Sequence, residues 1–260
     1  MIDKNSIIHP GAKIATSASV GPFCVIGPKV IIGKNVIVQS HVNIIGDTTI
    51  GQDCKIYPFA SIGNDPQDLK YNSEKTKLII GNNNRIREHV TINPGTIGGG
   101  GITKIGNNCL LMIGAHIAHD CLVGDNVIIA NNAAIAGHAI ISDNVVIGGN
   151  CGVQQFTRIG KFAMVGGMTG VSSDVIPYGL TIGNRNYLNG INVIGLRRKK
   201  IENKYIIELT NAYKEIFKTE NLNENLSKIN GKFNTNIFVK EIIDFINEDK
   251  KRPICTPFMK

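Results

Sequence analysis

The residues that could perform chemistry in this chain are concentrated in residues 115–121, which read AHIAHDC. The segment holds two imidazoles, His116 and His119, and the carboxylate of Asp120. A neutral imidazole can accept a hydroxyl proton near pH 7, and a neighbouring carboxylate can fix its tautomer and stabilise the imidazolium. No serine or cysteine is evidently placed as a nucleophile, so the segment predicts a general base that acts without a covalent intermediate.

Two further interpretations of these residues stay open. Clustered polar groups are often ordinary residues of a solvated surface. His116, His119 and His138 also make a candidate zinc site, because neutral imidazoles are good zinc ligands. Nothing in the sequence forces their nitrogens to converge, however, so we favour the general base and predict no metal.

A repeat of six residues must position this segment. An Ile, Val or Leu returns at every sixth position in three runs, from Ile8 to Ile62, from Ile80 to Ile92 and from Ile105 to Val171. Six residues make one short strand and a corner, so three hexads close a coil of about 18 residues, and about eight coils stack as parallel strands. The period predicts a mainly β fold, a parallel β-helix, in which a Gly after the aliphatic residue, as at positions 21, 27, 33, 51 and 63, lets the backbone turn.

The cysteines fit this repeat as core residues. Five of the six lie two positions before an aliphatic residue of the repeat, namely Cys24, Cys54, Cys109, Cys121 and Cys151. Buried cysteine behaves as a small hydrophobic residue. No two cysteines have CxxC spacing, which excludes a zinc ribbon or a thioredoxin motif.

Stacked coils bring residues that are 18 positions apart into columns. His119, Gly137 and Gln155 form one such column, and Asp120 and His138 belong to the next. Gly137 therefore offers a backbone N–H beside His119 with no side chain in the way, as an oxyanion stabiliser requires.

Two segments interrupt the repeat and one region follows it. Residues 64–77 and 94–103 read as loops that project from the β-helix (residues 1–190), and such loops often carry binding groups. In the first loop Asp68 and Lys70 are candidates for binding sugar hydroxyls or phosphate, or they are charges on a solvated turn. Residues 191–260 show helical spacing and predict a helical domain over the open end of the β-helix, with Gly231 and the Asn-rich stretch 221–236 separating its helices.

Composition narrows the class of protein. The 260 residues are 42% hydrophobic and contain no apolar run near 18 residues, so we expect no membrane insertion. The N-terminus lacks the pattern of a secretory signal, which predicts a cytoplasmic protein. The net charge is +8, with 14 basic and 9 acidic residues in 197–260, and suits an acidic partner. Aromatic residues are 6% with no Trp, which disfavours nucleic-acid binding.

Several segments resemble the UDP-N-acetylglucosamine 3-O-acyltransferase family of hexapeptide-repeat enzymes. They are FASIGNDPQDLKY (59–71), GNNNRIREHVTI (81–92), LLMIGAHIAHDCLVGDNVIIANNAAIAGH (110–138) and GNRNYLNGINVIGLRRK (183–199). The resemblance implies a homotrimer of left-handed β-helices with active sites between subunits. It implies transfer of an (R)-3-hydroxyacyl chain from acyl carrier protein to the 3-position of UDP-GlcNAc, the first step of lipid A biosynthesis. It implies no metal and no dissociable cofactor, since the donor brings its own phosphopantetheine.

The resemblance also assigns roles to single residues. His119 would be the general base, Asp120 its support, and Gly137 the oxyanion N–H. Further positions fall into three groups. Those near the reacting centre are Gln67, Asp68, Lys70, His116 and His138. Those that bind the nucleotide or the phosphopantetheine are Gln155, Asn192, Arg198 and Lys199. Those near the end of the acyl tunnel are Gly167 and Arg185.

The chain departs from the family pattern at a few positions. Gln154, which we count among the substrate-binding residues, stands where His is usual, Ile194 where Glu is frequent and Lys199 where Arg is expected, and Asn93 and Pro94 are also unusual. Lys cannot make the bidentate phosphate contact of Arg. These departures leave open a 3-amino sugar as acceptor. A related sugar acyltransferase or acetyltransferase, a zinc hydrase of the γ-carbonic anhydrase type and a non-catalytic scaffold also stay open.

Overall fold

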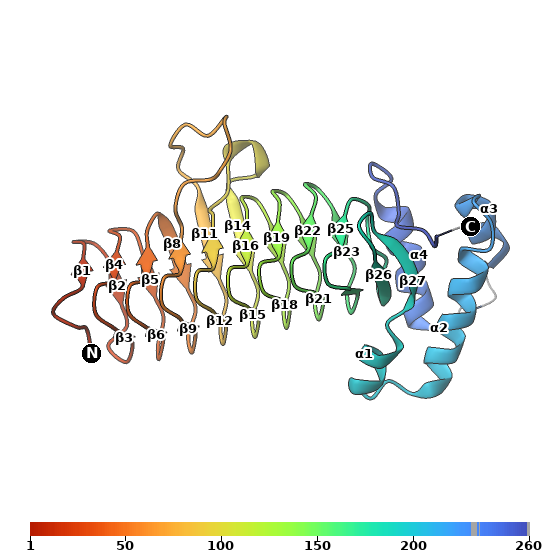
Figure 1. Cartoon of the computed structure of the whole chain (residues 1–260), viewed down its shortest axis with the longest axis horizontal. Helices are drawn as coiled ribbons and strands as arrows, with labels where there is room; N and C mark the ends of the chain where they lie inside the picture. Colours follow the sequence, from red (N-terminus) through yellow and green to blue (C-terminus); the bar gives the residue numbers. More distant parts are fainter. Residues whose placement is uncertain (230–232, 234, 259–260) are drawn as a thin grey trace.

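The computed structural model shows a left-handed parallel β-helix whose C-terminal end is covered by helices (Figure 1). It describes residues 1–229, 233 and 235–258. Short strands stack into three sheets that are parallel except for the last pair of the third sheet, β26 and β27, which is antiparallel, and successive strands of the coils pass from the first sheet to the second and then to the third. The sheets have nine, eight and ten strands, slightly more coils than the sequence predicts. The fold class predicted from the six-residue period is confirmed.

The strand bounds follow the hexads. The first sheet contains β1 (Ile7–Ile8), β4 (Val25–Ile26), β7 (Asn43–Ile44), β10 (Ser61–Ile62), β13 (Thr91–Ile92), β16 (His116–Ile117), β19 (Ala134–Ile135), β22 (Gly152–Val153) and β25 (Gly170–Val171). The second contains β2 (Lys13–Ile14), β5 (Ile31–Ile32), β8 (Asp47–Ile50), β11 (Lys77–Ile80), β14 (Ile102–Ile105), β17 (Leu122–Val123), β20 (Ile140–Ile141) and β23 (Arg158–Ile159). The third contains β3 (Ser19–Val20), β6 (Ile37–Val38), β9 (Lys55–Ile56), β12 (Arg85–Ile86), β15 (Leu110–Leu111), β18 (Ile128–Ile129), β21 (Val146–Ile147), β24 (Met164–Val165), β26 (Gly179–Ile182) and β27 (Tyr187–Ile191).

The corners are made differently from the sequence prediction. The residues with φ near +60° are mostly Asn, Asp, His and Phe, for example Asn35 (58°) and Asn126 (58°). Of the Gly residues that follow an aliphatic residue in the first run, Gly63 has a positive φ, whereas Gly21, Gly27, Gly33 and Gly51 do not. Asn and Asp tolerate this left-handed conformation better than most residues. The Gly is needed for close stacking instead, because a Cβ on Gly33 would lie 2.7 Å from the carbonyl carbon of Gly51 in the next coil.

The interior of the β-helix is a single column of apolar side chains. The aliphatic residue of each strand points inward and is almost fully buried, as Ile26, Ile86 and Ile129 are. All six cysteines are free and buried. Burial raises the pKa of Cys109 to about 11 and that of Cys121 to about 12, so these thiols stay protonated and unreactive near neutral pH.

The helical region packs on the last coils with a core of its own. Its helices are α1 (Val193–Arg198), α2 (Asn203–Ile216), α3 (Leu222–Ile229) and α4 (Ile237–Glu248). This second core starts at Ile176 and so includes side chains of β27, such as Leu188 and Ile191. The Asn-rich stretch was predicted only to separate two helices, and that was wrong, because α3 lies within it; its Asn225 is buried and donates to the carbonyl of Ile216. Gly231 lies outside the described residues.

The two interruptions of the repeat project from one edge of the β-helix. They replace corners between the first and second sheets, the first between β10 and β11 and the second between β13 and β14 (Figure 1). Asn93 joins them, because its side-chain amide donates to the carbonyls of Asn64 (3.0 Å) and Asp65 (3.1 Å). No helix in the described part of the chain is long and apolar enough to cross a membrane.

Because all six thiols are buried, we expect them to react only after the protein unfolds. We expect a thiol reagent such as 5,5′-dithiobis(2-nitrobenzoate) to label the native protein very slowly at pH 8 and all six cysteines rapidly in about 6 M guanidinium chloride, because only unfolding exposes the sulfurs. Absorbance at 412 nm measures both. Rapid labelling of a cysteine in the native protein would contradict the core assignment.

Candidate active site

The regular geometry of the coil places His119 and Asp120 at the corner between β16 and β17. His119 Nδ1 lies 2.8 Å from Asp120 Oδ2, and the Asp120 side chain is fully buried. A carboxylate only accepts hydrogen bonds, so Nδ1 carries the proton and Nε2 keeps its lone pair. Asp120 has φ of +60°, which turns its side chain back toward the imidazole of the preceding residue. The pair is therefore arranged as a general base and its support.

Gly137 lies directly beside the basic nitrogen. A Cβ at this position would lie 2.7 Å from His119 Nε2 and 2.6 Å from Cε1, so only glycine fits. Among the described residues, nothing accepts a hydrogen bond from the Gly137 N–H. An N–H that is free and close to the base can stabilise negative charge on an oxygen that reacts there.

Two further imidazoles flank the pair. The ring of His138 meets that of His119 edge to face at 5.0 Å and stacks on Phe156 at 4.4 Å. His116 Nδ1 lies 2.7 Å from the hydroxyl of Thr91 on the neighbouring strand. Burial lowers the pKa of both His116 and His138, and the nearby His119 lowers that of His116 further. Both side chains are thus kept neutral and available for hydrogen bonding to a polar substrate.

A hollow of about 730 Å³ opens in front of His119 along the first sheet. Its floor consists of small residues that repeat every 18 positions from His116, namely Ala134, Gly152 and Gly170. Gln67, Gln154 and Gln155 line it with polar groups, and Arg185 lies at its far end. The small-residue column was not singled out in the sequence, although the period of 18 was sufficient to find it.

The remaining predicted residues lie outside this hollow in a single chain. Asp68 Oδ1 accepts from the backbone N–H of Lys70 (3.0 Å), and the Lys70 side chain is exposed. Gly167 is exposed at the corner between the third and first sheets. Asn192 begins α1: its Oδ1 accepts from Gly195 N–H (3.0 Å) and its amide donates to the Phe162 carbonyl (2.9 Å).

Arg198 and Lys199 end α1 as exposed residues. In Figure 1 this helix lies at the lower edge of the C-terminal region, whereas the two loops rise from the upper edge of the β-helix. The structure of one chain therefore brings His119, Asp120 and Gly137 together beside an apolar trough, but it does not bring Asn192, Arg198 and Lys199 to them.

The same residues are a poor metal site. Donor atoms of His119, Asp120 and His138 lie within 4.8 Å of one another. Both oxygens of Asp120 already accept hydrogen bonds, however: Oδ1 from Thr96 N–H (2.8 Å), and Oδ2 from the Thr96 hydroxyl (2.6 Å) and from His119. His119 Nδ1 carries a proton, so His119 could bind a metal only through Nε2. The arrangement favours proton transfer over metal binding.

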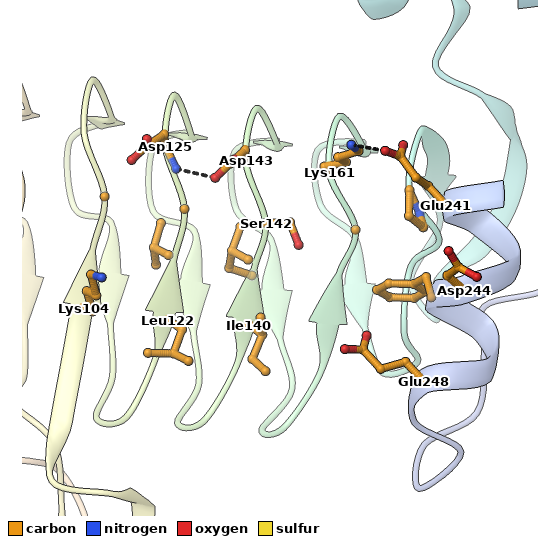
Figure 2. A pocket seen from close by; sticks show the side chains of 17 residues that line it. Lys104, Leu122, Asp125, Ile140, Ser142, Asp143, Lys161, Glu241, Asp244 and Glu248 are labelled. Atoms are coloured by element: carbon orange, nitrogen blue, oxygen red, sulfur yellow. Dashed lines mark hydrogen bonds and ion pairs between the residues drawn. The ribbon is translucent and has the colours of Figure 1, made fainter. Parts of the chain in front are cut away.

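A larger groove, of about 850 Å³, lies between the second sheet and α4 (Figure 2). Two of its charged side chains pair, since Lys161 Nζ lies 2.5 Å from Glu241 Oε1, and Asp143 Oδ1 accepts from the backbone N–H of Asp125 (2.8 Å). Among the described residues, its lining contains no histidine or cysteine. We assign it no chemistry.

Comparisons with protein families match both halves of the chain. Residues 29–64 and 102–137 match the bacterial transferase hexapeptide family, and residues 174–255 match domain 2 of the UDP N-acetylglucosamine O-acyltransferase family.

Similar proteins cover nearly the full chain. A Rickettsia canadensis protein named acyl-[acyl-carrier-protein]–UDP-N-acetylglucosamine O-acyltransferase is 55% identical over 96% of this chain and 98% of its own. A protein of the same name from Azorhizobium caulinodans is 50% identical over 99% of this chain and 95% of its own. The crystal structure of UDP-N-acetylglucosamine O-acyltransferase from Moraxella catarrhalis superposes with a TM-score of 0.94 at 44% identity, covering 97% of this chain and 98% of the other.

The lowered pKa of His116 predicts that acid destabilises the fold. In the unfolded chain His116 binds a proton near its ordinary pKa of 6.5, whereas the folded state resists protonation. Stability is therefore unaffected above that pH and falls as the pH drops below it toward the lower folded-state value. We expect the melting temperature of the wild type to decline between about pH 7 and pH 5, and that of His116→Asn to decline less steeply.

Differential scanning fluorimetry between about pH 5 and pH 7 measures how steeply the melting temperature changes with pH. His9→Asn, at an exposed position of the first coil, is the matched control and should retain the wild-type slope. Equal slopes for His116→Asn and wild type would contradict a neutral, buried His116.

Proposed function

The chain belongs to the UDP-N-acetylglucosamine O-acyltransferase family, and we propose that it transfers an (R)-3-hydroxyacyl chain from acyl carrier protein to the 3-hydroxyl of UDP-GlcNAc. This reaction would be the first step of lipid A biosynthesis. The observation that carries the proposal is the buried His119–Asp120 pair, with its 2.8 Å hydrogen bond, beside the free N–H of Gly137.

The proposed mechanism is direct attack of the sugar hydroxyl on the thioester. His119 Nε2 removes the hydroxyl proton as the oxygen attacks the thioester carbon, and the carbonyl oxygen gains negative charge next to the Gly137 N–H. The tetrahedral species then breaks the carbon–sulfur bond. The imidazolium returns the proton to the departing phosphopantetheine thiolate, so that an ester and a free thiol result. Asp120 stabilises the imidazolium while it exists.

The trough along the first sheet suits the acyl chain. Ala134, Gly152 and Gly170 leave a shallow apolar path from His116 toward Arg185. It spans three strand spacings, about 14 Å, which is enough for roughly ten methylene groups. The apolar floor would remove the chain from water, and each buried methylene contributes about 0.8 kcal/mol. Chains much longer than the trough would have to pass Arg185.

We propose a homotrimer with its active sites between subunits. In one chain the trough is open on one side, and the predicted phosphate-binding residues Asn192, Arg198 and Lys199 do not line it. A second copy would cover the trough and bring those residues of its own chain to the nucleotide or the phosphopantetheine. The net charge of +8 would attract the acidic carrier protein.

The proposal includes neither a metal nor a dissociable cofactor. Proton transfer by His119 and charge stabilisation by Gly137 account for each step. In the cluster of His119, Asp120 and His138, the Asp120 oxygens and His119 Nδ1 are already engaged in hydrogen bonds, which disfavours a zinc hydrase of the γ-carbonic anhydrase type. Acylation of a 3-amino sugar would use the same residues, so an assay with both sugars is needed to distinguish the two acceptors.

The central test is transfer from a panel of hydroxyacyl carrier proteins to UDP-GlcNAc, measured by mass spectrometry. We expect product with wild type and a loss of at least about a hundredfold with His119→Ala, because general-base catalysis contributes about 10²–10⁴-fold. A parallel reaction with EDTA should proceed at the same rate. Product from the 3-amino sugar but none from UDP-GlcNAc would show that the acceptor is the 3-amino sugar. Activity of His119→Ala equal to that of wild type would overturn the mechanism.

The close contact between Gly137 and His119 gives a second prediction. Gly137→Ala keeps the backbone N–H but places a methyl group within 3 Å of His119, so the imidazole must move away from the reacting atoms and kcat should fall by at least about a hundredfold, as expected for loss of the general base. Circular dichroism and the melting temperature of this variant check that the fold is retained while the imidazole is displaced. Wild-type kcat in this variant would contradict the role of His119 as the general base.

A further inference from the structure

The second loop covers the catalytic carboxylate, although it reads from sequence as a projecting excursion. It replaces the corner one coil before the corner that carries His119 and Asp120. Thr96, in this loop, is buried and donates twice to Asp120: its N–H to Oδ1 at 2.8 Å and its hydroxyl to Oδ2 at 2.6 Å. One residue of the loop thus supplies two of the three side-chain hydrogen bonds that the carboxylate accepts.

The Thr96 hydroxyl binds Asp120 instead of capping the short helix that follows it. Thr96 precedes the short 3-10 helix Ile97–Gly99, a position where a Thr hydroxyl commonly accepts from the first turn. Here the hydroxyl makes no such bond and donates to Asp120 instead. The backbone carbonyl of Thr96 accepts from the N–H of Gly99 and of Gly101, which folds the loop into a tight turn.

The glycines of the loop allow this close approach. A Cβ on Gly99 would lie 2.0 Å from the Asp120 carboxyl carbon, and one on Gly95 would lie 2.1 Å from the backbone nitrogen of Ile102. The loop therefore lies flat on the carboxylate and excludes water from it. At the strand end of the same loop, the Thr103 hydroxyl accepts from the Asp120 N–H (2.7 Å), which supports its left-handed backbone.

We propose that Thr96 is a positioning residue for the catalytic pair, and that residues 94–101 are a clamp that holds the Asp120 carboxylate in the orientation from which it binds His119 Nδ1. The inference rests on the proposed function, because it assigns Thr96 to the support of the general base. Thr96 does not line the hollow, so it acts through Asp120 and not through substrate.

The physical reason is the geometry that His119 needs. A carboxylate with a single donor can rotate about its Cβ–Cγ bond, whereas donors on both oxygens hold its plane fixed. The orientation of that plane directs Nδ1–H and so places Nε2 toward the acceptor hydroxyl. Loss of such a supporting hydrogen bond typically costs about 10–100-fold in activity.

Thr96→Val keeps the size of the side chain and removes only the hydroxyl. We expect kcat for acyl transfer to fall about tenfold or more with both KM values unchanged, and Thr96→Ser to recover most of the rate. The matched control is Thr157→Val, since the buried Thr157 hydroxyl has no partner among the described residues, and it should keep wild-type kcat.

The effect of Thr96→Val in the Asp120→Ala variant tests whether Thr96 acts through Asp120. If Thr96 acts through Asp120, adding Thr96→Val to Asp120→Ala changes kcat by less than about twofold. A further tenfold loss in that background, or a fall in activity through KM, would overturn the positioning role.

Amide exchange tests the clamp without any substrate. Asp120→Ala removes the acceptor of the Thr96 N–H, so exchange in the peptide that contains this amide should be at least about tenfold faster than in wild type, and unchanged in Thr157→Val. Unchanged exchange in Asp120→Ala would refute the clamp. If wild type shows the clamp by exchange but transfers nothing to UDP-GlcNAc, the proposed function fails and the structural part of this inference stands.

Discussion

Uniform stacking of coils is the constraint on which the rest of this structure depends. Each strand forms hydrogen bonds with the strand above and below it in a constant register, as His116 does with Thr91 on one side and Ala134 on the other. Because every coil repeats the same path, a side chain that points outward has a fixed neighbour one coil away. Columns of residues, and not single turns, are therefore the units from which a site can be built.

The proposed catalytic arrangement follows from two such columns at one corner. His119 stands over the bare backbone of Gly137, and Asp120 stands over His138. The corner conformation contributes as well, because the positive φ of Asp120 and His138 directs both side chains across the same edge. A rigid apolar interior lies directly behind this edge, so the site needs little reorganisation to hold charge.

The insertions act where the stacking is least constrained. A corner can be lengthened without disturbing the strands on either side, and the two loops lengthen the corners that lie two coils and one coil before the corner of His119 and Asp120. Asn93 ties the first loop to the second, and Thr96 ties the second to Asp120. Hydrogen bonds thus connect the loop that carries Gln67 to Asn93, and the second loop to the buried carboxylate of Asp120. The coils beneath the loops stay regular.

The parallel β-helix, the burial of the repeat cysteines and the columns that contain His119, Gly137, Asp120 and His138 could be predicted from the amino-acid sequence. These features depend on a period of six, and a period needs only local residue types and repeated strand pairing. The left-handed corners, as at Asn126, Asn132 and His138, follow the same period, and the sequence analysis missed them. The helix α3 and the fold-back of the second loop could not be predicted, because they depend on packing between segments that share no period. The contact of Thr96 with Asp120 and the capping of α1 by Asn192 are known only from the tertiary structure, because they lie in non-periodic segments whose paths are set by what they pack against.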